Sequence, residues 1–417
     1  MMNPPHVIIV GGGFGGLSAA RVFRGQPVRV TLLDRRNHHL FQPLLYQVAT
    51  ATLSPGDIAA PIRWVFRRQA NLRVLLGEAG TIDVKARRIT LTDGASLDYD
   101  YLIVATGASH AYFGHDDWAK YAPGLKTLED AIEIRTRMLL AFERAERETD
   151  PVRQQQLLTF VIVGGGPTGV ELVGTLAEIA RQTLRHEFRS IDTSRARIVL
   201  VEAGPTILPA FPERLRNAAR ESLQRLGIEV QEKTAVTGID ESGVLLGTER
   251  LAAGTVVWAA GVAASPIVRT LGTPLDRAGR AIVNPDLSIP GHPEVFVVGD
   301  AASFTQDGKP LPGVAQVAMQ GATRAARNVL RLAEGQPTRA FTYKDKGSLA
   351  IIGRGSAIAD LGWARFAGLP AWLVWLFIHI FMLIGFRNRL AVMLQWGTAY
   401  MTFQRSVRLI TGRAQST

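Results

Sequence analysis

The sequence predicts an α/β fold made of two Rossmann-like dinucleotide-binding domains, followed by a C-terminal module of different composition. Three observations support this prediction. A glycine-rich turn set between a short apolar run and a helical pattern occurs twice, short apolar strands alternate with helical segments over most of the chain, and the last quarter is apolar and basic. Strands that alternate with helices are typical of mostly parallel sheets.

The length and composition limit the number of domains and exclude several kinds of functional site. With 417 residues and 45.3 kDa, the chain has room for two or three domains. A content of 47% hydrophobic and 20% charged residues indicates globular domains rather than disorder. The sequence has no cysteine, which excludes a disulfide scaffold, a thiolate metal site, an iron–sulfur cluster and a cysteine nucleophile.

The duplicated turn defines the domains. Residues 6–20 read HVIIVGGGFGGLSAA and residues 160–174 read FVIVGGGPTGVELVG, so that the glycine runs begin 153 residues apart. A spacing this long indicates two similar domains rather than a solenoid. We expect a first dinucleotide domain over residues 1–112, a second over 113–285, a return to the first over 286–335, and a C-terminal module over 336–417.

The first glycine motif is Gly11-x-Gly13-x-x-Gly16, and Asp34 closes the strand that follows its helix. In such a motif one glycine makes the tight turn, one lets the backbone approach a pyrophosphate, and one lets the helix pack on the strand. The helix N-terminus then favours the anion, and the acid accepts bonds from ribose hydroxyls. Without these flanking elements the motif would indicate only a glycine-rich turn.

The second motif is Gly164-x-Gly166-x-x-Gly169, with Glu202 as its acid. A carboxylate at this place suits a free ribose 2′-hydroxyl and repels a 2′-phosphate, so NADH is favoured over NADPH. The alternative for Glu202 is an ordinary surface carboxylate.

Two dinucleotide sites in one chain indicate one flavin and one nicotinamide. Thr106 and Gly107 end a strand where the chain would leave the first domain, and Asp300 follows a strand just before a helix expected to begin near Pro312. An aspartate there can bond the flavin ribityl chain. Each turn alone would be unremarkable in a protein, but their order beside both glycine motifs favours a flavin site.

The chain resembles the type II NADH:quinone oxidoreductases, the single-subunit alternative NADH dehydrogenases, and with them the two-dinucleotide-binding-domain flavoprotein fold. The resemblance extends over nearly the whole length. The segments that carry it are FQPLLYQVA (residues 41–49), residues 164–171, VGD (298–300), AQVAMQ (315–320) and IGFRNR (384–389).

The resemblance implies a site for each substrate and cofactor. The implied FAD residues are Gly11, Gly13, Phe14, Gly15, Gly16, Asp34, Pro43, Leu44, Thr106, Gly107 and Asp300. The implied NADH residues are Gly164, Gly166, Gly169 and Glu202. Further cofactor contacts are implied for Gly261, Gln316 and Val317.

The implied catalytic residues are Glu171, near the nicotinamide, and Gln316 and Gln320, in the quinone pocket. Spaced i, i+4 on a helix, the two glutamines share one face and can offer amides to a quinone carbonyl. The alternatives are a helix N-terminal carboxylate for Glu171 and a polar helix face for the glutamines. Met319 stands where some family members carry histidine, and Lys346 lies in a family block near the flavin or is a solvated charge.

The expected chemistry is a non-proton-pumping transfer of two electrons from NADH through FAD to a quinone. Because the flavin performs the reaction, the protein supplies position and electrostatics, and we nominate no strong general acid or base.

The sequence of the C-terminal module predicts that the protein attaches to a membrane through residues of about 366–405. Residues 369–386 carry no Asp, Glu, Lys or Arg, which makes them a marginal candidate span. The residues after them indicate an amphipathic helix on the surface of the bilayer instead, with a buried helix as a third alternative. Its expected polar face is Asn388, Gln395, Thr398, Thr402 and Arg405, and its expected apolar face is Val392, Trp396, Tyr400 and Phe403.

Charge and the N-terminus indicate a location. Of the net charge of +11, ten units fall after residue 320, together with four of the seven tryptophans, which favours an anionic membrane surface. The N-terminus lacks a targeting pattern. We therefore expect a peripheral protein on the cytoplasmic face of the inner (plasma) membrane, and the resemblance implies a homodimer.

Two other functions remain open. A soluble NADH-dependent flavoprotein that reduces a ferredoxin-like protein would share the two sites but not the apolar C-terminus. A flavin-bound regulator resembling apoptosis-inducing factor would bind nucleic acid through a charged stripe. The charge here brackets apolar helices, so we expect no nucleic-acid partner. Disulfide reductases and sulfide:quinone oxidoreductases need redox cysteines, which this sequence lacks.

Overall fold

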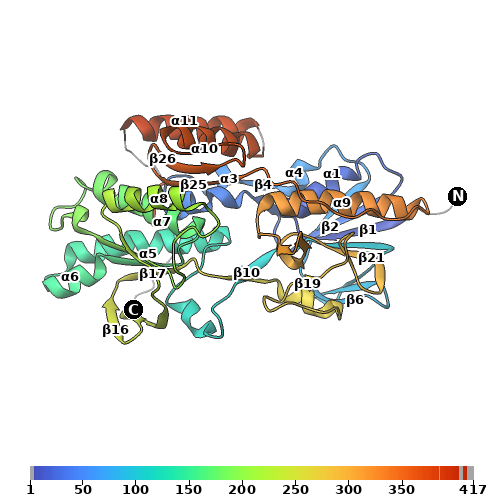
Figure 1. Cartoon of the computed structure of the whole chain (residues 1–417), viewed down its shortest axis with the longest axis horizontal. Helices are drawn as coiled ribbons and strands as arrows, with labels where there is room; N and C mark the ends of the chain where they lie inside the picture. The colour runs from blue at the N-terminus through green and yellow to red at the C-terminus, as the bar shows by residue number, and fades with distance from the viewer. Residues whose placement is uncertain (1–3, 385, 403–406, 411–417) are drawn as a thin grey trace. The chain divides into compact units, whose positions relative to one another are not determined.

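The computed structural model describes residues 4–384, 386–402 and 407–410 and divides into two compact units, labelled by element in Figure 1. Unit 1 consists of Met1–Leu40, Ala60–Ser109 and Val262–Asp345. Unit 2 consists of Phe41–Ala59, His110–Gly261 and Lys346–Thr417.

Unit 1 is built on a six-stranded sheet in which the five strands from β21 to β5 run parallel. In spatial order its strands are β20 (Ser288–Ile289), β21 (His292–Val297), β9 (Tyr101–Val104), β1 (His6–Val10), β2 (Arg29–Asp34) and β5 (Leu72–Leu76). Helices α1 (Phe14–Val22) and α9 (Ala315–Ala333) pack against each other in this unit. β6 (Ala79–Asp83), β7 (Arg88–Leu91) and β8 (Ser96–Asp98) form a separate antiparallel sheet.

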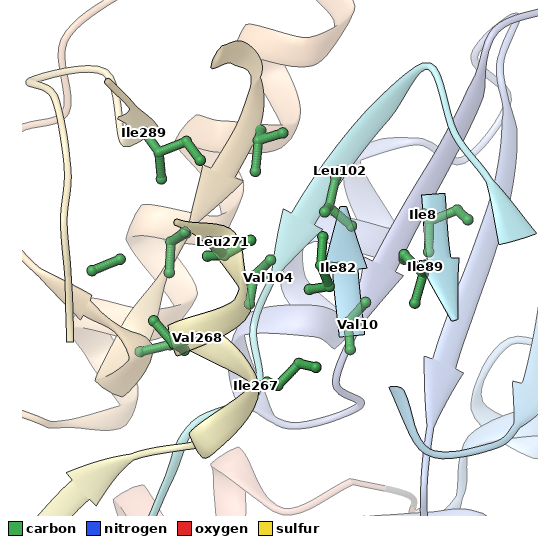
Figure 2. Packing of buried hydrophobic residues seen from close by; sticks show 14 of the residues in the cluster. Ile8, Val10, Ile82, Ile89, Leu102, Val104, Ile267, Val268, Leu271 and Ile289 are labelled. Atoms are coloured by element: carbon green, nitrogen blue, oxygen red, sulfur yellow. The ribbon is translucent and has the colours of Figure 1, made fainter. Parts of the chain in front are cut away.

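The core of unit 1 joins segments far apart in the sequence. Figure 2 shows Ile8 and Val10 of β1 and Leu102 and Val104 of β9 in one buried cluster with Leu271. Leu271 ends the short helix η5 (Pro266–Leu271), which contacts β6. Burying β-branched and leucine side chains in such a cluster contributes about 1.5–3 kcal/mol for each. This packing places residues 262–285 with the first sheet.

Unit 2 repeats the same plan. Its four-stranded parallel sheet has the order β13 (Glu229–Gln231), β12 (Arg197–Val201), β11 (Thr159–Val163) and β17 (Thr255–Trp258). It corresponds strand for strand to β5-β2-β1-β9 of unit 1. A second antiparallel sheet again accompanies it, formed by β14 (Val236–Asp240), β15 (Gly243–Leu246) and β16 (Glu249–Ala252). The predicted duplication is therefore a duplication of structure.

The end of the chain folds as part of unit 2. β25 (Ser348–Gly353), β26 (Ser356–Asp360) and β27 (Arg365–Gly368) form an antiparallel sheet that packs on helix α7 (Pro167–Glu178), with α8 (Glu213–Arg225) beside it. A Cβ on Gly174 would overlap the carbonyl oxygen of Ile352, so glycine lets helix and strand meet at backbone distance. The expected domain boundaries at 112, 285 and 335 stay a prediction. The chain passes from one compact unit to the other at 40/41, 59/60, 109/110, 261/262 and 345/346.

Two helices follow these strands. α10 (Leu369–Met382) and α11 (Phe386–Thr402) contact each other, and α10 also packs on β26 (Figure 1). The apolar run of residues 369–386 is thus interrupted after Met382. Within the described ranges, no helix combines the length and apolarity needed to cross a bilayer. The exposed residues of α10 include Leu369, Leu373, Phe377 and Phe381, which follow one another at i, i+4 spacing.

The expected apolar face of α11 is not the one left open. Val392 is buried, and the Trp396 indole donates a hydrogen bond of 2.7 Å to the side-chain oxygen of Gln47, so both residues pack inward. Among the residues of this helix whose side chains are described, the exposed apolar ones are Leu390, Met393 and Leu394. Because α11 packs against the rest of the protein, it has one apolar face that is buried and other apolar residues that are exposed. The sequence analysis assumed a single apolar face and therefore did not separate the two. Phe403 and Arg405 lie outside the described residues.

Candidate functional site

The first glycine loop has the geometry that close backbone packing requires. Gly11 has φ +106°, in a region that side chains rarely adopt, and a Cβ there would overlap the carbonyl of Ala105. A Cβ on Gly16 would overlap the carbonyl oxygen of Gly11. At Gly13, by contrast, no atom lies within 4 Å of a Cβ position. The loop is therefore tight toward the protein and open at the N-terminus of α1.

Asp34, at the end of β2, holds this loop in place through hydrogen bonds from the backbone. One carboxylate oxygen accepts from the Gly12 N–H, and the other accepts from the Arg36 N–H at 2.6 Å. A carboxylate has about four acceptor sites, so these two bonds leave capacity for ribose hydroxyls.

The second loop has the same geometry. Gly164 has φ +114°, and a Cβ on Gly169 would overlap the Gly164 carbonyl. The Glu202 carboxylate accepts from the N–H groups of Gly165 and Gly204, both at 2.6 Å. A Cβ at Gly166 would again meet no atom within 4 Å. Each parallel sheet thus presents an equivalent open loop with an acid beside it.

The remaining predicted residues of unit 1 also fit a dinucleotide. The Thr106 hydroxyl is buried and has no hydrogen-bond partner among the described residues, so a bound group can satisfy it. Gly107 has φ +68°. A pocket of about 350 Å³, including its open mouth, borders Asp300 and Val317. Phe14 and Gly15 form the first turn of α1, where Gly15 packs near the α9 backbone.

Besides the residues of the second glycine loop and Glu202, three predicted cofactor residues belong to unit 2. Pro43 and Leu44 lie in the short helix η1 (Gln42–Leu44), and the Leu44 side chain is fully buried, which leaves its backbone as the part able to contact a ligand. Gly261 has φ +80°, and a Cβ there would overlap the ring of Phe113.

The structure distinguishes the two predicted quinone glutamines. The Gln320 side chain donates to the Lys344 carbonyl at 2.9 Å and accepts from the Lys344 N–H at 3.1 Å. Gln316, one turn earlier on α9, has no side-chain hydrogen bond to any residue the structure describes. Gln320 therefore anchors the segment after α9, while the Gln316 amide keeps its bonding capacity. Lys346 is exposed.

Glu171 is the most perturbed carboxyl of the site. It lies on α7, beside the backbone N–H of Ile351. Burial raises the pKa of Glu171 to about 8, although the Ile351 N–H opposes part of that rise. The group therefore carries a proton at neutral pH, a property that no sequence pattern indicated.

A second pocket, of about 700 Å³ including its open mouth, lies within unit 2 below α10 and α11. The Trp375 side chain is 2% exposed, and its indole N–H has no acceptor in the described part of the chain. The Gln47 amide, held by Trp396, donates to the Tyr46 hydroxyl at 2.9 Å. The aromatic and amide residues of the lining are Tyr46, Gln47, Gln182, Trp372, Trp375 and Trp396. The sequence interpretation missed this pocket, although the tryptophans of the last quarter were a signal for it.

No cluster of potential metal ligands occurs in the part of the chain that the structure describes. His379 is a packed side chain: its Nδ1 donates to the Trp375 carbonyl at 2.7 Å, its ring stacks on that of Trp375, and burial lowers its pKa to about 4.

Comparison with known proteins addresses the family of the chain and its fold. The model of the pyridine nucleotide-disulphide oxidoreductases matches residues 5–322, and that of the NDH2 C-terminal domain matches residues 346–406. NDH2 from Plasmodium falciparum, solved in complex with NADH, has a TM-score of 0.88 over 96% of this chain and 99% of its own, at 21% identity. The sulfide:quinone oxidoreductase of Aquifex aeolicus has a TM-score of 0.73 over 96% of both chains, at 19% identity. Identities this low show the fold alone.

Sequence relatives are more specific. The type II NADH:quinone oxidoreductase NdhA of Mycobacterium tuberculosis is 46% identical over 98% of this chain and 90% of its own length. The type II NADH:quinone oxidoreductase of Haemophilus influenzae is 31% identical over 85% of this chain and 87% of its own length. With both modules matched and identity extending over nearly its whole length, the chain belongs to the type II NADH:quinone oxidoreductase family.

Proposed function

We propose that this chain is an FAD-dependent enzyme that transfers two electrons from NADH to a membrane quinone and pumps no protons. The observation that carries the proposal is the pair of equivalent glycine loops, each open at a helix N-terminus and each held by a carboxylate. One loop suits the cofactor and the other the co-substrate.

The residues of unit 1 that would hold FAD are those whose hydrogen-bond donors or acceptors are not fully used within the protein. The N-terminus of α1 offers N–H groups to the pyrophosphate, Asp34 accepts from ribose, and the buried Thr106 hydroxyl and Asp300 complete the site. Bound there, FAD supplies the redox chemistry, accepting hydride from NADH and passing electrons to quinone. The protein contributes orientation and the exclusion of competing reactions.

Glu202 would select NADH. Its carboxylate is already fixed by two backbone N–H groups, so it is rigid and can accept from a ribose 2′-hydroxyl. A 2′-phosphate at the same place would be repelled by the negative charge.

Glu171 would hold a proton. With its pKa raised to about 8, the carboxyl group is mostly protonated at neutral pH and is close to the operating pH that favours proton transfer. Reduction of a quinone consumes two protons, and Glu171 offers one that is already inside the protein.

Each unit, taken by itself, offers one feature that would suit a quinone. The Gln316 amide in unit 1 has no hydrogen-bond partner among the described residues, whereas Gln320 acts through the segment that it anchors. The tryptophan-rich pocket of unit 2 suits a flat, lipid-soluble acceptor better than a protein surface does. This favours quinone over a ferredoxin-like protein as the oxidant.

Attachment to the membrane would run through residues of about 366–405. The exposed stripe of α10 and the exposed apolar side chains of α11 offer an apolar surface to lipid, and the charge of the last quarter is positive. We assign this surface to the cytoplasmic face of the inner membrane, and we retain a homodimer as the expected assembly.

The test is rapid-mixing spectroscopy of the two half-reactions without oxygen. NADH should bleach the oxidised-flavin absorbance of the purified protein, and a short-chain quinone should restore it. Bleaching that only a ferredoxin-like protein reverses would contradict the quinone assignment. A protein that is colourless and takes up no added FAD would contradict the whole proposal.

A further inference from the structure

The carbonyl of the middle glycine is held in both dinucleotide loops, but by different groups. In unit 1 the Nδ1 of His39 bonds to the Gly12 carbonyl oxygen at 3.0 Å. In unit 2 the backbone N–H of Leu208 donates to the Gly165 carbonyl oxygen at 2.8 Å. The donors follow their acids, Asp34 and Glu202, by five and six residues. The same carbonyl is thus hydrogen-bonded in both loops, by a side chain in one and by the backbone in the other. This indicates that the hydrogen bond is needed for the conformation of the loop.

The contact fixes the direction of a peptide group. The peptide between Gly12 and Gly13 is planar and trans, so its carbonyl oxygen and its N–H point in opposite directions. Directing the oxygen at His39 therefore directs the Gly13 N–H away from His39. That N–H has no acceptor among the described residues, and it lies at the start of α1, where an anion is favoured.

His39 is built to keep one orientation. Its side chain is 2% exposed, and its ring meets the ring of Phe14 edge-on at 5.1 Å. A carbonyl oxygen can only accept, so Nδ1 carries the proton and the tautomer is determined. Burial lowers the pKa of His39 to about 4, so the imidazole stays neutral in the physiological range. The residue thus supplies a hydrogen bond and no charge.

We propose that His39 is a positioning residue for the FAD pyrophosphate: by holding the Gly12 carbonyl, it presents the Gly13 N–H to the phosphate oxygens. The inference rests on the assignment of FAD to the first loop. It names a function for a side chain that lies outside both glycine motifs.

The test separates the hydrogen bond from the packing of the ring. His39→Phe keeps an aromatic ring beside Phe14 and removes the donor, whereas His39→Asn removes the ring and keeps an N–H on the atom attached to Cγ. The Kd of FAD for the cofactor-stripped full chain is measured by flavin fluorescence, with NAD⁺ binding at the second loop as the internal control. We expect the FAD Kd to rise about 3- to 10-fold in His39→Phe, the loss of one net hydrogen bond, and to stay within about 2-fold of wild type in His39→Asn.

The outcomes are distinguishable. An unchanged FAD Kd in His39→Phe, or weak FAD binding confined to His39→Asn, would show that packing alone matters and would overturn the inference. Equal weakening of FAD and NAD⁺ in His39→Phe would also overturn it, because the second loop is held by Leu208. Should one variant fail to fold, the other decides by itself, since each has its own predicted value. Failure of the wild-type chain to bind FAD would instead remove the proposed function.

Discussion

The carboxylate of Glu171 lies beside the backbone N–H of Ile351, 180 residues further along the chain. The contact joins α7, which begins at the second glycine loop, to β25 in the module that carries the two C-terminal helices. The position of this single carboxyl group thus depends both on the helix that follows the second glycine loop and on the C-terminal strands packed against that helix.

The first prediction concerns pH. The pKa of Glu171 is near 4.5 when unperturbed and about 8 in the folded chain, so the folded state binds more protons between these values. Stability from this group is fully present below about pH 4.5 and is lost as the pH rises through about 8. We expect the free energy of unfolding of wild type to fall relative to that of Glu171→Gln between about pH 5 and pH 8 in urea titrations. Parallel pH profiles of the two proteins would contradict the raised pKa.

The second prediction concerns the nucleotide. Glu202→Gln keeps an oxygen that can accept from the loop and removes the charge that repels a 2′-phosphate. We expect the ratio of kcat/KM for NADPH to that for NADH to rise about 10-fold, an effect of about 1.4 kcal/mol. Asp34→Asn, the equivalent change beside the other loop, is the matched control and should leave the ratio unchanged. An unaltered ratio in Glu202→Gln would remove the ribose assignment.

The third prediction separates the two glutamines. Gln316→Ala should slow reoxidation of the reduced flavin by quinone without changing its reduction by NADH or the stability. Gln320→Ala breaks two hydrogen bonds to the Lys344 backbone and should lower the free energy of unfolding by about 1–2 kcal/mol. Stopped-flow half-reactions and urea titration of both variants provide the measurements. A stability loss in Gln316→Ala equal to that in Gln320→Ala would contradict the distinction.

The fourth prediction concerns packing within unit 2. Gly174→Ala places a Cβ against the Ile352 carbonyl oxygen, which belongs to backbone and cannot rotate away. We expect a loss of about 3 kcal/mol or more, since α7 and β25 must separate. Gly397→Ala on α11 is the control, because no atom lies within 4 Å of its Cβ position and helical alanine is favoured by about 0.5–1 kcal/mol. Comparable unfolding midpoints for the two variants would refute the close contact.

The fifth prediction concerns the membrane. Phe377 and Phe381 are 70% and 62% exposed on α10, and replacing both with glutamate puts charge into the apolar stripe. We expect binding to anionic vesicles to fall at least about 10-fold in a sedimentation assay, with flavin reduction by NADH retained. Leu76→Glu, at a 62% exposed leucine of β5, should leave vesicle binding intact. Undiminished sedimentation of the double variant would place the attachment surface elsewhere.

Local rules were sufficient for much of this protein. The strand–turn–helix units, the glycines at Gly11 and Gly164 and the acids Asp34 and Glu202 were predictable, because each depends on residues close together in sequence and on the backbone freedom of glycine. The same rules predicted two sheets of the same kind and a C-terminal module with surface helices. The rules could not show which face of α11 would be buried, because Val392 and Trp396 are apolar whether they meet lipid or the rest of the protein.

Long-range contacts decided the rest. The unit to which each segment belongs, the proton on Glu171, the different tasks of Gln316 and Gln320, and the hydrogen bond from His39 all depend on neighbours brought together by folding. A pKa reflects the polarity of all surrounding atoms, and a free or occupied amide depends on what lies within 3 Å of it. Pattern in the chain specified which chemistry was possible, and packing in three dimensions specified which side chains were left able to perform it.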